Sequence, residues 1–309
     1  MQRWYYAHSG VSIASELELP EWSQCGQPAG CEIPVPDVVV RVEPSGPTES
    51  ARGTQLRSIT AGEYRLRVPD VGHFHVRDGR EIHVKPLPAA EPARLRPWLL
   101  GPAWGALCYQ RDMFIVHASA VRIDGGAVMF CGRAGRGKST LAAQLGTRGY
   151  ALVGDDLCRL HFPPQGPPVV YPSPPRVKLW RDALGELGWG ARELAPDHLR
   201  EGKFHLTLTG PGTGASLAEP VPVRGAYLLA WGELGVRELH GMAAFHGFLA
   251  EATWRIRMLE RMGQVGPHSR RCMEFLQQVP LAELTRPRDF LASAGTMDFL
   301  AGQWSRATV

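Results

Sequence analysis

The stretch Gly132-Arg133-Ala134-Gly135-Arg136-Gly137-Lys138-Ser139 fills every fixed position of the pattern G-x-x-x-x-G-K-S/T. The apolar run 127–131 before it is typical of a buried strand, and residues 140–145 after it have helical composition. Strand, glycine-rich loop and helix in this order form the P-loop unit, in which backbone N–H groups at the helix N-terminus hold phosphate oxygens. The stretch therefore predicts an α/β domain that binds a nucleoside triphosphate.

The residue types within the loop predict how the phosphates are held. We expect the eight residues Gly132 to Ser139, together with Thr140, to contact ATP. Lys138 would reach the β- and γ-phosphates, and the Ser139 hydroxyl would be a ligand of Mg²⁺. ATP and Mg²⁺ are therefore the expected cofactors.

The sequence before the loop predicts a β-hairpin that carries a histidine to the phosphates. Asp124-Gly125 separates the strand-like runs 117–123 and 126–130, and Asp-Gly in this setting favours a two-residue turn. With Ile123 opposite Gly126, His117 falls opposite Gly132. The alternative is a structural histidine at the start of a strand, and a register slip of one residue would turn its side chain to the other face.

An acidic pair, Asp155-Asp156, follows the next predicted strand at 150–154. Ligands of open α/β sheets bind beyond the carboxyl ends of the strands. Adjacent residues on an extended chain point to opposite faces, so we expect the two acids to divide the work. One would support Mg²⁺ and the other would accept the proton of an attacking hydroxyl. The alternative is a solvated turn.

Several cations are candidates for neutralising charge on a transferring phosphoryl group. Arg176 and Lys178 are preferred because they follow a proline-rich loop and are expected to lie at the edge of the cleft. The others are Lys203, Arg286 and Arg288. Taken singly, each of these side chains is more often an ordinary surface cation.

Composition excludes several other classes of protein. The 309 residues are 44% hydrophobic and 21% charged with a net charge of +4, which is typical of a globular protein with a sizeable core. The charges are scattered, so nucleic acid is not an expected partner. No apolar run could span a membrane and the N-terminus lacks a signal core, so the expected location is cytoplasmic.

The six cysteines include no C-x-x-C pair. Cys131 and Cys158 lie in apolar runs and are expected to be core residues. Cys25 and Cys31 could pair or bind a metal, although two cysteines supply only half of a tetrahedral site.

Two regions are predicted along the chain. Residues 1–90 form a smaller β-rich domain, a meander of short half-buried strands with a hairpin turn at 77–80 and a polar loop at 43–53. Residues 91–309 form the P-loop catalytic domain. Its remaining expected elements are two helices in 90–112 broken by Gly101-Pro102, helices at 177–187, 243–262 and 269–278, a glycine-rich turn at 210–216, strands at 226–231 and 279–284, and a terminal helix.

The run from His117 to Asp156 resembles the catalytic domain of HPr kinase/phosphorylase and its relatives. The shared features are a His-x-x-x-Val opening strand, the P-loop, Arg148-Gly149-Tyr150 and the Asp-Asp pair. The separations also match, with 21 residues from His117 to Lys138 and 18 from Lys138 to Asp156. The resemblance implies a P-loop fold with a mixed sheet.

The same resemblance implies ATP-dependent phosphorylation of a serine hydroxyl on a protein or peptide, and it is compatible with a homo-oligomer. It implies that Asp156 is the general base, with His117 as its partner. Lys138 would then bind the phosphates, Ser139 would bind Mg²⁺, and Asp155 would be the supporting acid at the metal.

Two departures bear on the substrate. Thr140 occupies a position that is Glu in the bifunctional enzymes, and no Glu occurs between Leu160 and Gly185, where those enzymes have a metal-binding Glu. Both departures disfavour phosphorylase activity and HPr as the substrate. Residues 175–180 and 6–21 resemble a branch encoded beside lasso-peptide maturation enzymes, which implies a precursor-peptide serine as acceptor.

Three readings remain beside the preferred peptide or protein serine kinase. The first is an HPr-type kinase/phosphorylase. The second is a kinase for a small-molecule alcohol, which would use the same catalytic residues with a different acceptor pocket. The third is a nucleotide-dependent switch with little transfer activity.

Overall fold

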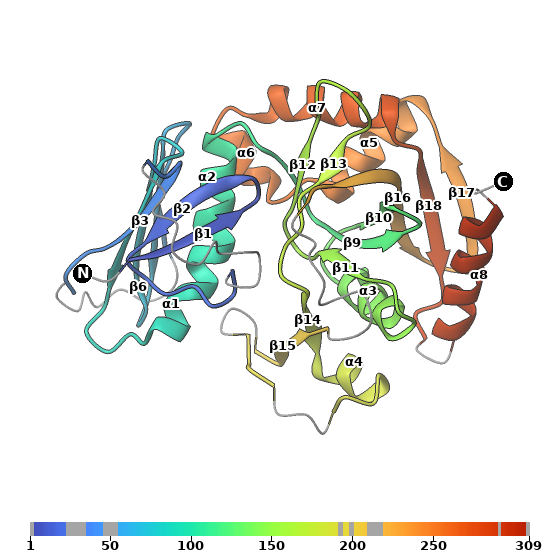
Figure 1. Ribbon diagram of the computed structural model, residues 1–309, viewed down its shortest axis with the longest axis horizontal. Coiled ribbons are helices and arrows are strands. Elements are labelled where there is room, and N and C mark those ends of the chain that lie inside the picture. Colours follow the sequence, from blue (N-terminus) through green and yellow to red (C-terminus); the bar gives the residue numbers. More distant parts are fainter. Residues whose placement is uncertain are drawn as a thin grey trace.

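Two large sheets, each with its own helices, make up most of this mixed α/β chain (Figure 1). The computed structural model describes residues 3–22, 35–45, 55–190, 194–197, 201–208, 219–289 and 292–306, without the side chains of 55–57 and 306. Cys25 and Cys31, most of the predicted loop at 43–53 and the predicted turn at 210–216 lie outside the described residues.

The N-terminal sheet has seven strands in the order β1-β2-β3-β7-β6-β5-β4. The strands β4 to β7 form an antiparallel meander, with Asp78 and Gly79 at positive φ in the predicted turn between β6 and β7. The strand β3 is parallel to both of its neighbours, so the meander prediction is wrong for β3, while β1 and β2 form an antiparallel pair. The strands are β1 Trp4–His8, β2 Val11–Ser15, β3 Val38–Val42, β4 Gln55–Ile59, β5 Glu63–Val68, β6 Gly72–Arg77 and β7 Glu81–Pro86.

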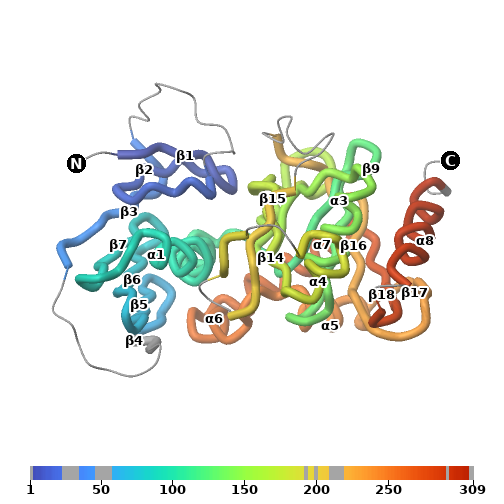
Figure 2. Tube along the Cα trace, turned by 90° about the horizontal axis from the view of Figure 1, so that it is seen from below, coloured from blue at the N-terminus to red at the C-terminus, as the bar shows by residue number. Residues whose placement is uncertain are grey.

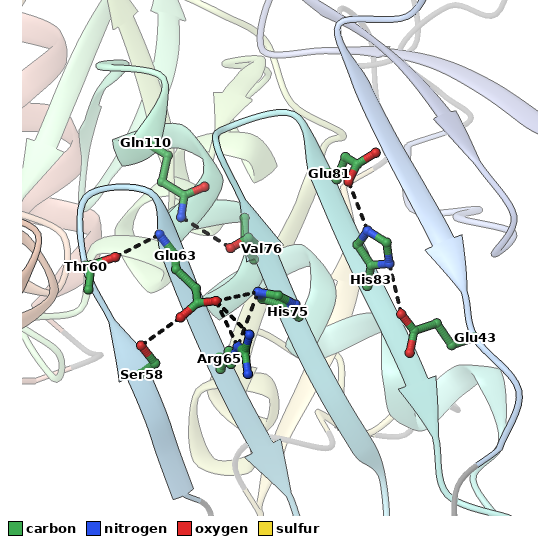
Figure 3. Close-up of polar contacts among 10 residues, drawn as sticks. All are labelled: Glu43, Ser58, Thr60, Glu63, Arg65, His75, Val76, Glu81, His83 and Gln110. Carbon is green, nitrogen blue, oxygen red and sulfur yellow. Dashed lines mark hydrogen bonds and ion pairs between the residues drawn. The ribbon is translucent and has the colours of Figure 1, made fainter.

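The outer face of this sheet is polar at β5, β6 and β7, where every second residue is charged or histidine. The Glu63 carboxylate accepts hydrogen bonds from Ser58 and Arg65 and lies 3.1 Å from Nε2 of His75 (Figure 3). A second group of this kind is centred on His83. The hydrogen bonds, that of Ser58 first, lower the pKa of Glu63. The apolar residues of the sheet therefore face inward.

Three consecutive helical segments pack against that inner face and share its core. The predicted break at Gly101-Pro102 is instead a π-helical turn, whose wider winding accommodates the proline without ending the helical path. The same core includes Trp254, Met258 and Leu259, which follow far later in the chain. The segments are α1 Pro92–Trp98, the π-helix η2 Leu99–Ala103 and α2 Trp104–Gln110.

The second sheet has nine strands, and its central part positions the P-loop. The β9–β10 hairpin has the predicted register, Ile123 opposite Gly126, with Asp124 and Gly125 at positive φ in the turn. The order β11-β9-β10-β16-β18 is antiparallel at β9 and parallel from β10 to β18. The carboxyl ends of β11, β10, β16 and β18 therefore lie along one edge. The strands are β8 Phe114–Val116, β9 Ala118–Ile123, β10 Gly126–Cys131, β11 Leu152–Gly154, β12 Cys158–His161, β13 Val169–Val170, β16 Val221–Trp231, β17 Gly235–Leu239 and β18 Leu281–Arg286.

Helices cover both faces of this sheet, and a small hairpin lies beside it (Figures 1 and 2). One core contains side chains of α3 and α8, and the other contains side chains of α5 and α7. In the described parts of the chain, no helix is long and apolar enough to cross a membrane. The elements are α3 Lys138–Thr147, β14 Arg176–Trp180, α4 Arg181–Glu186, β15 Lys203–Thr207, α5 Gly241–Ala252, α6 Ile256–Arg261, α7 Val265–Gln278 and α8 Ser293–Arg306.

Two predicted helices differ from the structure. The segment 177–187 begins as β14, because Val177 and Leu179 alternate inward while the strand pairs with β15. The helix at 243–262 is divided into α5 and α6, because Thr253 bridges to Val116 and Arg255 adopts φ +48°.

Candidate functional site

The P-loop connects β10 to α3 and has the backbone geometry that its glycines allow. Gly137 has φ +74°, and a Cβ at this position would lie 2.7 Å from Nη2 of Arg286. The helix α3 has no side-chain cap at its N-terminus, so its first N–H groups are left for an anion. The loop therefore has the features of a phosphate cradle.

Lys138 lies under the loop with 6% of its surface exposed. Its Nζ donates to the carbonyl oxygens of Gly132, at 2.5 Å, and Arg133, at 3.3 Å. Burial lowers the pKa of Lys138, while the charges of Asp155 and Asp156 oppose that shift. The ammonium group is thus held beside the cradle.

The loop is fixed at its two sides by residues far away in the sequence. The backbone N–H and the Nε of Arg133 both bond to the Glu251 carboxylate on α5. The Arg133 side chain is therefore paired with Glu251. On the other side, Nη2 of Arg286 donates to the Arg136 carbonyl at 2.7 Å. These contacts orient the loop without using its glycine N–H groups.

Asp155 follows β11 and is bound by two serines. The hydroxyls of Ser119 and Ser139 both donate to its Oδ1, at 2.5 Å and 2.9 Å. Burial raises the pKa of Asp155 and the neighbouring Asp156 adds to the shift, while the two hydroxyls oppose it. Asp155 is thereby joined to the hydroxyl at the end of the P-loop.

Asp156 points elsewhere and is paired with a histidine. Its Oδ1 lies 3.5 Å from Nε2 of His117, and 49% of its side chain is exposed. Asp156 has φ +70°, a left-handed conformation that Asp tolerates better than most residues. The backbone N–H of His117 donates to the Ala252 carbonyl at 2.7 Å, which fixes the start of the hairpin. The two acids are therefore neighbours in different surroundings.

A cavity of about 720 Å³ brings these groups together. Lys138, Ser139, Asp155, Asp156 and His117 all line it. Further lining residues come from α1, from the β14–β15 hairpin and from the end of β18. A larger cavity of about 1080 Å³ lies by the Asp124-Gly125 turn at the opposite edge of the sheet and is lined by none of these five residues.

The candidate cations are distributed differently around this cavity. Lys178 lines it and lies 3.8 Å from the buried Asp197. Lys203, Arg286 and Arg288 also line it. Arg176 does not, and its guanidinium lies 3.9 Å from Glu21 in the N-terminal region.

Sequence reasoning missed two residues of the site. Ser119 lies in the middle of an apolar run, and its contact with Asp155 depends on the pairing of β9 with β11. Trp231 ends β16, and its ring lies 4.3 Å from the Arg286 guanidinium carbon. One signal could have found both residues: Trp231 ends its strand and Ser119 is the second residue of its strand, and both of these strand ends lie at the P-loop edge.

Comparisons with known proteins add little beyond this geometry. No protein-family model matches the sequence, and no curated protein matches it. Among solved structures the chain is similar to the HPr(Ser) kinase/phosphatase from Coxiella burnetii, with 14% identity and a TM-score of 0.34, over 62% of this chain and 98% of that one. At this level the likeness assigns neither an activity nor site residues.

Proposed function

We propose that this chain is an ATP-dependent kinase that transfers the γ-phosphoryl group to an alcohol, most specifically to a serine of a peptide or protein. One observation carries the proposal: two adjacent acids at the P-loop edge have different partners. Asp155 is bound to the P-loop serine, whereas Asp156 is half-exposed beside His117. Pairs of titratable groups in contrasting environments are typical of acid–base sites.

The geometry suggests a simple sequence of events. The loop N–H groups and Lys138 hold the phosphates of ATP. A hydroxyl of the acceptor lies against Asp156, which takes its proton while the oxygen attacks the γ-phosphorus and the bond to the β-phosphate oxygen breaks, releasing ADP. His117 orients the Asp156 carboxylate and stays in contact with it while the carboxylate accepts the proton of the acceptor hydroxyl. Positioned acid–base groups of this kind contribute about 10²–10⁴-fold to a rate.

The residues present fit Mg²⁺. The Ser139 hydroxyl and the Asp155 carboxylate are both oxygen ligands and lie 2.9 Å apart. The described residues contain no group of three or more His, Cys, Asp or Glu that could hold a metal by itself, which suits an ion bound by few protein ligands plus phosphates. When bound, Mg²⁺ would neutralise charge on the phosphates and offset the cost of a buried Asp155 carboxylate.

The walls of the cavity favour a large acceptor. They come from several separate segments, among them Trp98 of α1, Trp180 of the hairpin and Arg255 between α5 and α6. Trp180 is 45% exposed, and an exposed aromatic residue that lines a cavity is available to contact a ligand. We propose an extended peptide in this position. A lasso-type precursor peptide is the first acceptor to test, on the strength of the sequence resemblance.

ADP formation tests the class of activity. A kinase forms ADP in proportion to added acceptor peptide and little without it. A nucleotide switch forms ADP at a rate that no acceptor changes, and this result would reject the proposal. Glycerol and free serine, tested in parallel, address a small-molecule alcohol kinase.

A further inference from the structure

The order of strands along the P-loop edge separates two ends of the cavity. Asp155 and Asp156 follow β11, and the P-loop follows β10. Trp231 and Arg286 end β16 and β18 on the other side of β10. With the γ-phosphate toward the acids, as the proposed function requires, the nucleoside of ATP must lie on the side of Arg286.

That side of the cavity is lined by polar residues of two helices. Thr140 and Gln144 are one turn apart on α3 and face the same way, and Ser293 and Thr296 begin α8. The two helices contact each other and pack on the same face of the sheet. Both helices begin at this edge of the sheet, because α3 follows the P-loop and α8 follows β18.

Gln144 is the informative residue here. Its side chain lines the cavity although only 6% of the residue is exposed. Within the described part of the chain its carboxamide makes no hydrogen bond, whereas its backbone carbonyl accepts one from Thr147. An amide that reaches a cavity without an internal partner has a donor and an acceptor to offer a ligand.

Arg286 marks the boundary between the phosphates and this space. It is 8% exposed, stacks on Trp231 and uses Nη2 on the loop carbonyl of Arg136. Its Nε has no partner among the described residues. A cation buried against the phosphate loop, on the side away from the acids, is placed for the α-phosphate.

We propose that the space between α3 and α8 is a nucleoside pocket in which the Gln144 carboxamide pairs with the base of ATP and Arg286 contacts the adjoining phosphate. A carboxamide matches the amino and imine groups of adenine, because it presents one donor and one acceptor side by side. The nucleoside should therefore add to the affinity that the phosphates alone provide.

Calorimetric titration with ATP and inorganic tripolyphosphate tests this, since tripolyphosphate has the phosphates but no nucleoside. The wild type should bind ATP more tightly than tripolyphosphate. Gln144→Leu should weaken ATP about tenfold, a loss typical of hydrogen bonds to a buried polar group, and leave tripolyphosphate unchanged. Arg286→Gln is the contrasting variant and should weaken both ligands.

Equal ATP affinity in Gln144→Leu and the wild type would overturn the proposal, as would an equal loss for ATP and tripolyphosphate. Gln144→Met is a second variant of similar length, in case the leucine disturbs packing, and tripolyphosphate binding reports an intact loop in both. These titrations need no acceptor. A normal preference for ATP over tripolyphosphate without phosphotransfer would therefore reject the proposed kinase function while leaving the pocket in place.

Discussion

Ser119→Ala removes one of the two hydroxyls that stabilise the Asp155 carboxylate. The Ser119 side chain is fully buried and donates to Oδ1 at 2.5 Å, and Ser139 donates to the same oxygen at 2.9 Å. A hydrogen bond to a charged group contributes about 1.5–3 kcal/mol, against about 0.5–1.5 kcal/mol for a neutral pair. We expect the variant to lose about 1.5–3 kcal/mol of unfolding free energy at neutral pH.

The loss should depend on pH because the hydroxyl favours the charged carboxylate. The Ser119 hydrogen bond lowers the pKa of Asp155 against the larger effect of burial. Below the ordinary Asp pKa of ~3.9 the Asp155 carboxyl, whose pKa is raised, is largely protonated, so the variant should there lose only about 0.5–1.5 kcal/mol. Urea denaturation at both pH values measures the two losses.

Ser305→Ala is the matched control. The Ser305 hydroxyl is exposed and bonds to the Ala301 carbonyl within α8, so its removal should have little effect at either pH. A Ser119→Ala loss that is equal at the two pH values would refute the reasoning, because it would mean that the hydroxyl only fills space.

Two further predictions concern stability. Asp155→Asn should stabilise the nucleotide-free protein at neutral pH, because the raised pKa of Asp155 means that folding stability is lost as pH rises through that pKa. The gain should vanish below the ordinary Asp pKa in thermal denaturation against pH, and no gain at any pH would contradict it. Gly105→Ala should destabilise by about 1–3 kcal/mol, because a Cβ there would overlap the Trp254 ring. Gly302→Ala, in open space on α8, should stabilise by about 0.5–1 kcal/mol, and chemical denaturation in which both variants change alike would refute the contrast.

Local signals predicted much of the P-loop region. Asp124-Gly125 specified a tight turn, and the turn specified the register that brings His117 to the loop. The strand before Asp155 was predicted from its apolar run, and it lies on the expected edge.

The remaining features depend on contacts between distant segments. Thr253 leaves the helical path because it bridges to Val116, and no glycine or proline between α5 and α6 marks the break. The sequence presented Arg286 as one of several candidate cations. In the structure, the parallel pairing of β16 with β18 places it beside Trp231. Arg176 was preferred from its position after the proline-rich loop, but its partner is Glu21, more than a hundred residues earlier in the chain.

Mass spectrometry of a serine-containing precursor peptide, incubated with ATP, Mg²⁺ and the protein, is the most direct test of the kinase proposal. The account predicts a phosphoryl mass gain on serine that Asp156→Asn slows by about 10²–10⁴-fold. ATP affinity should stay unchanged, because Asp156 contacts His117 rather than the P-loop serine. A variant that phosphorylates the peptide as fast as the wild type would contradict the role of Asp156 and the division of labour between the two acids.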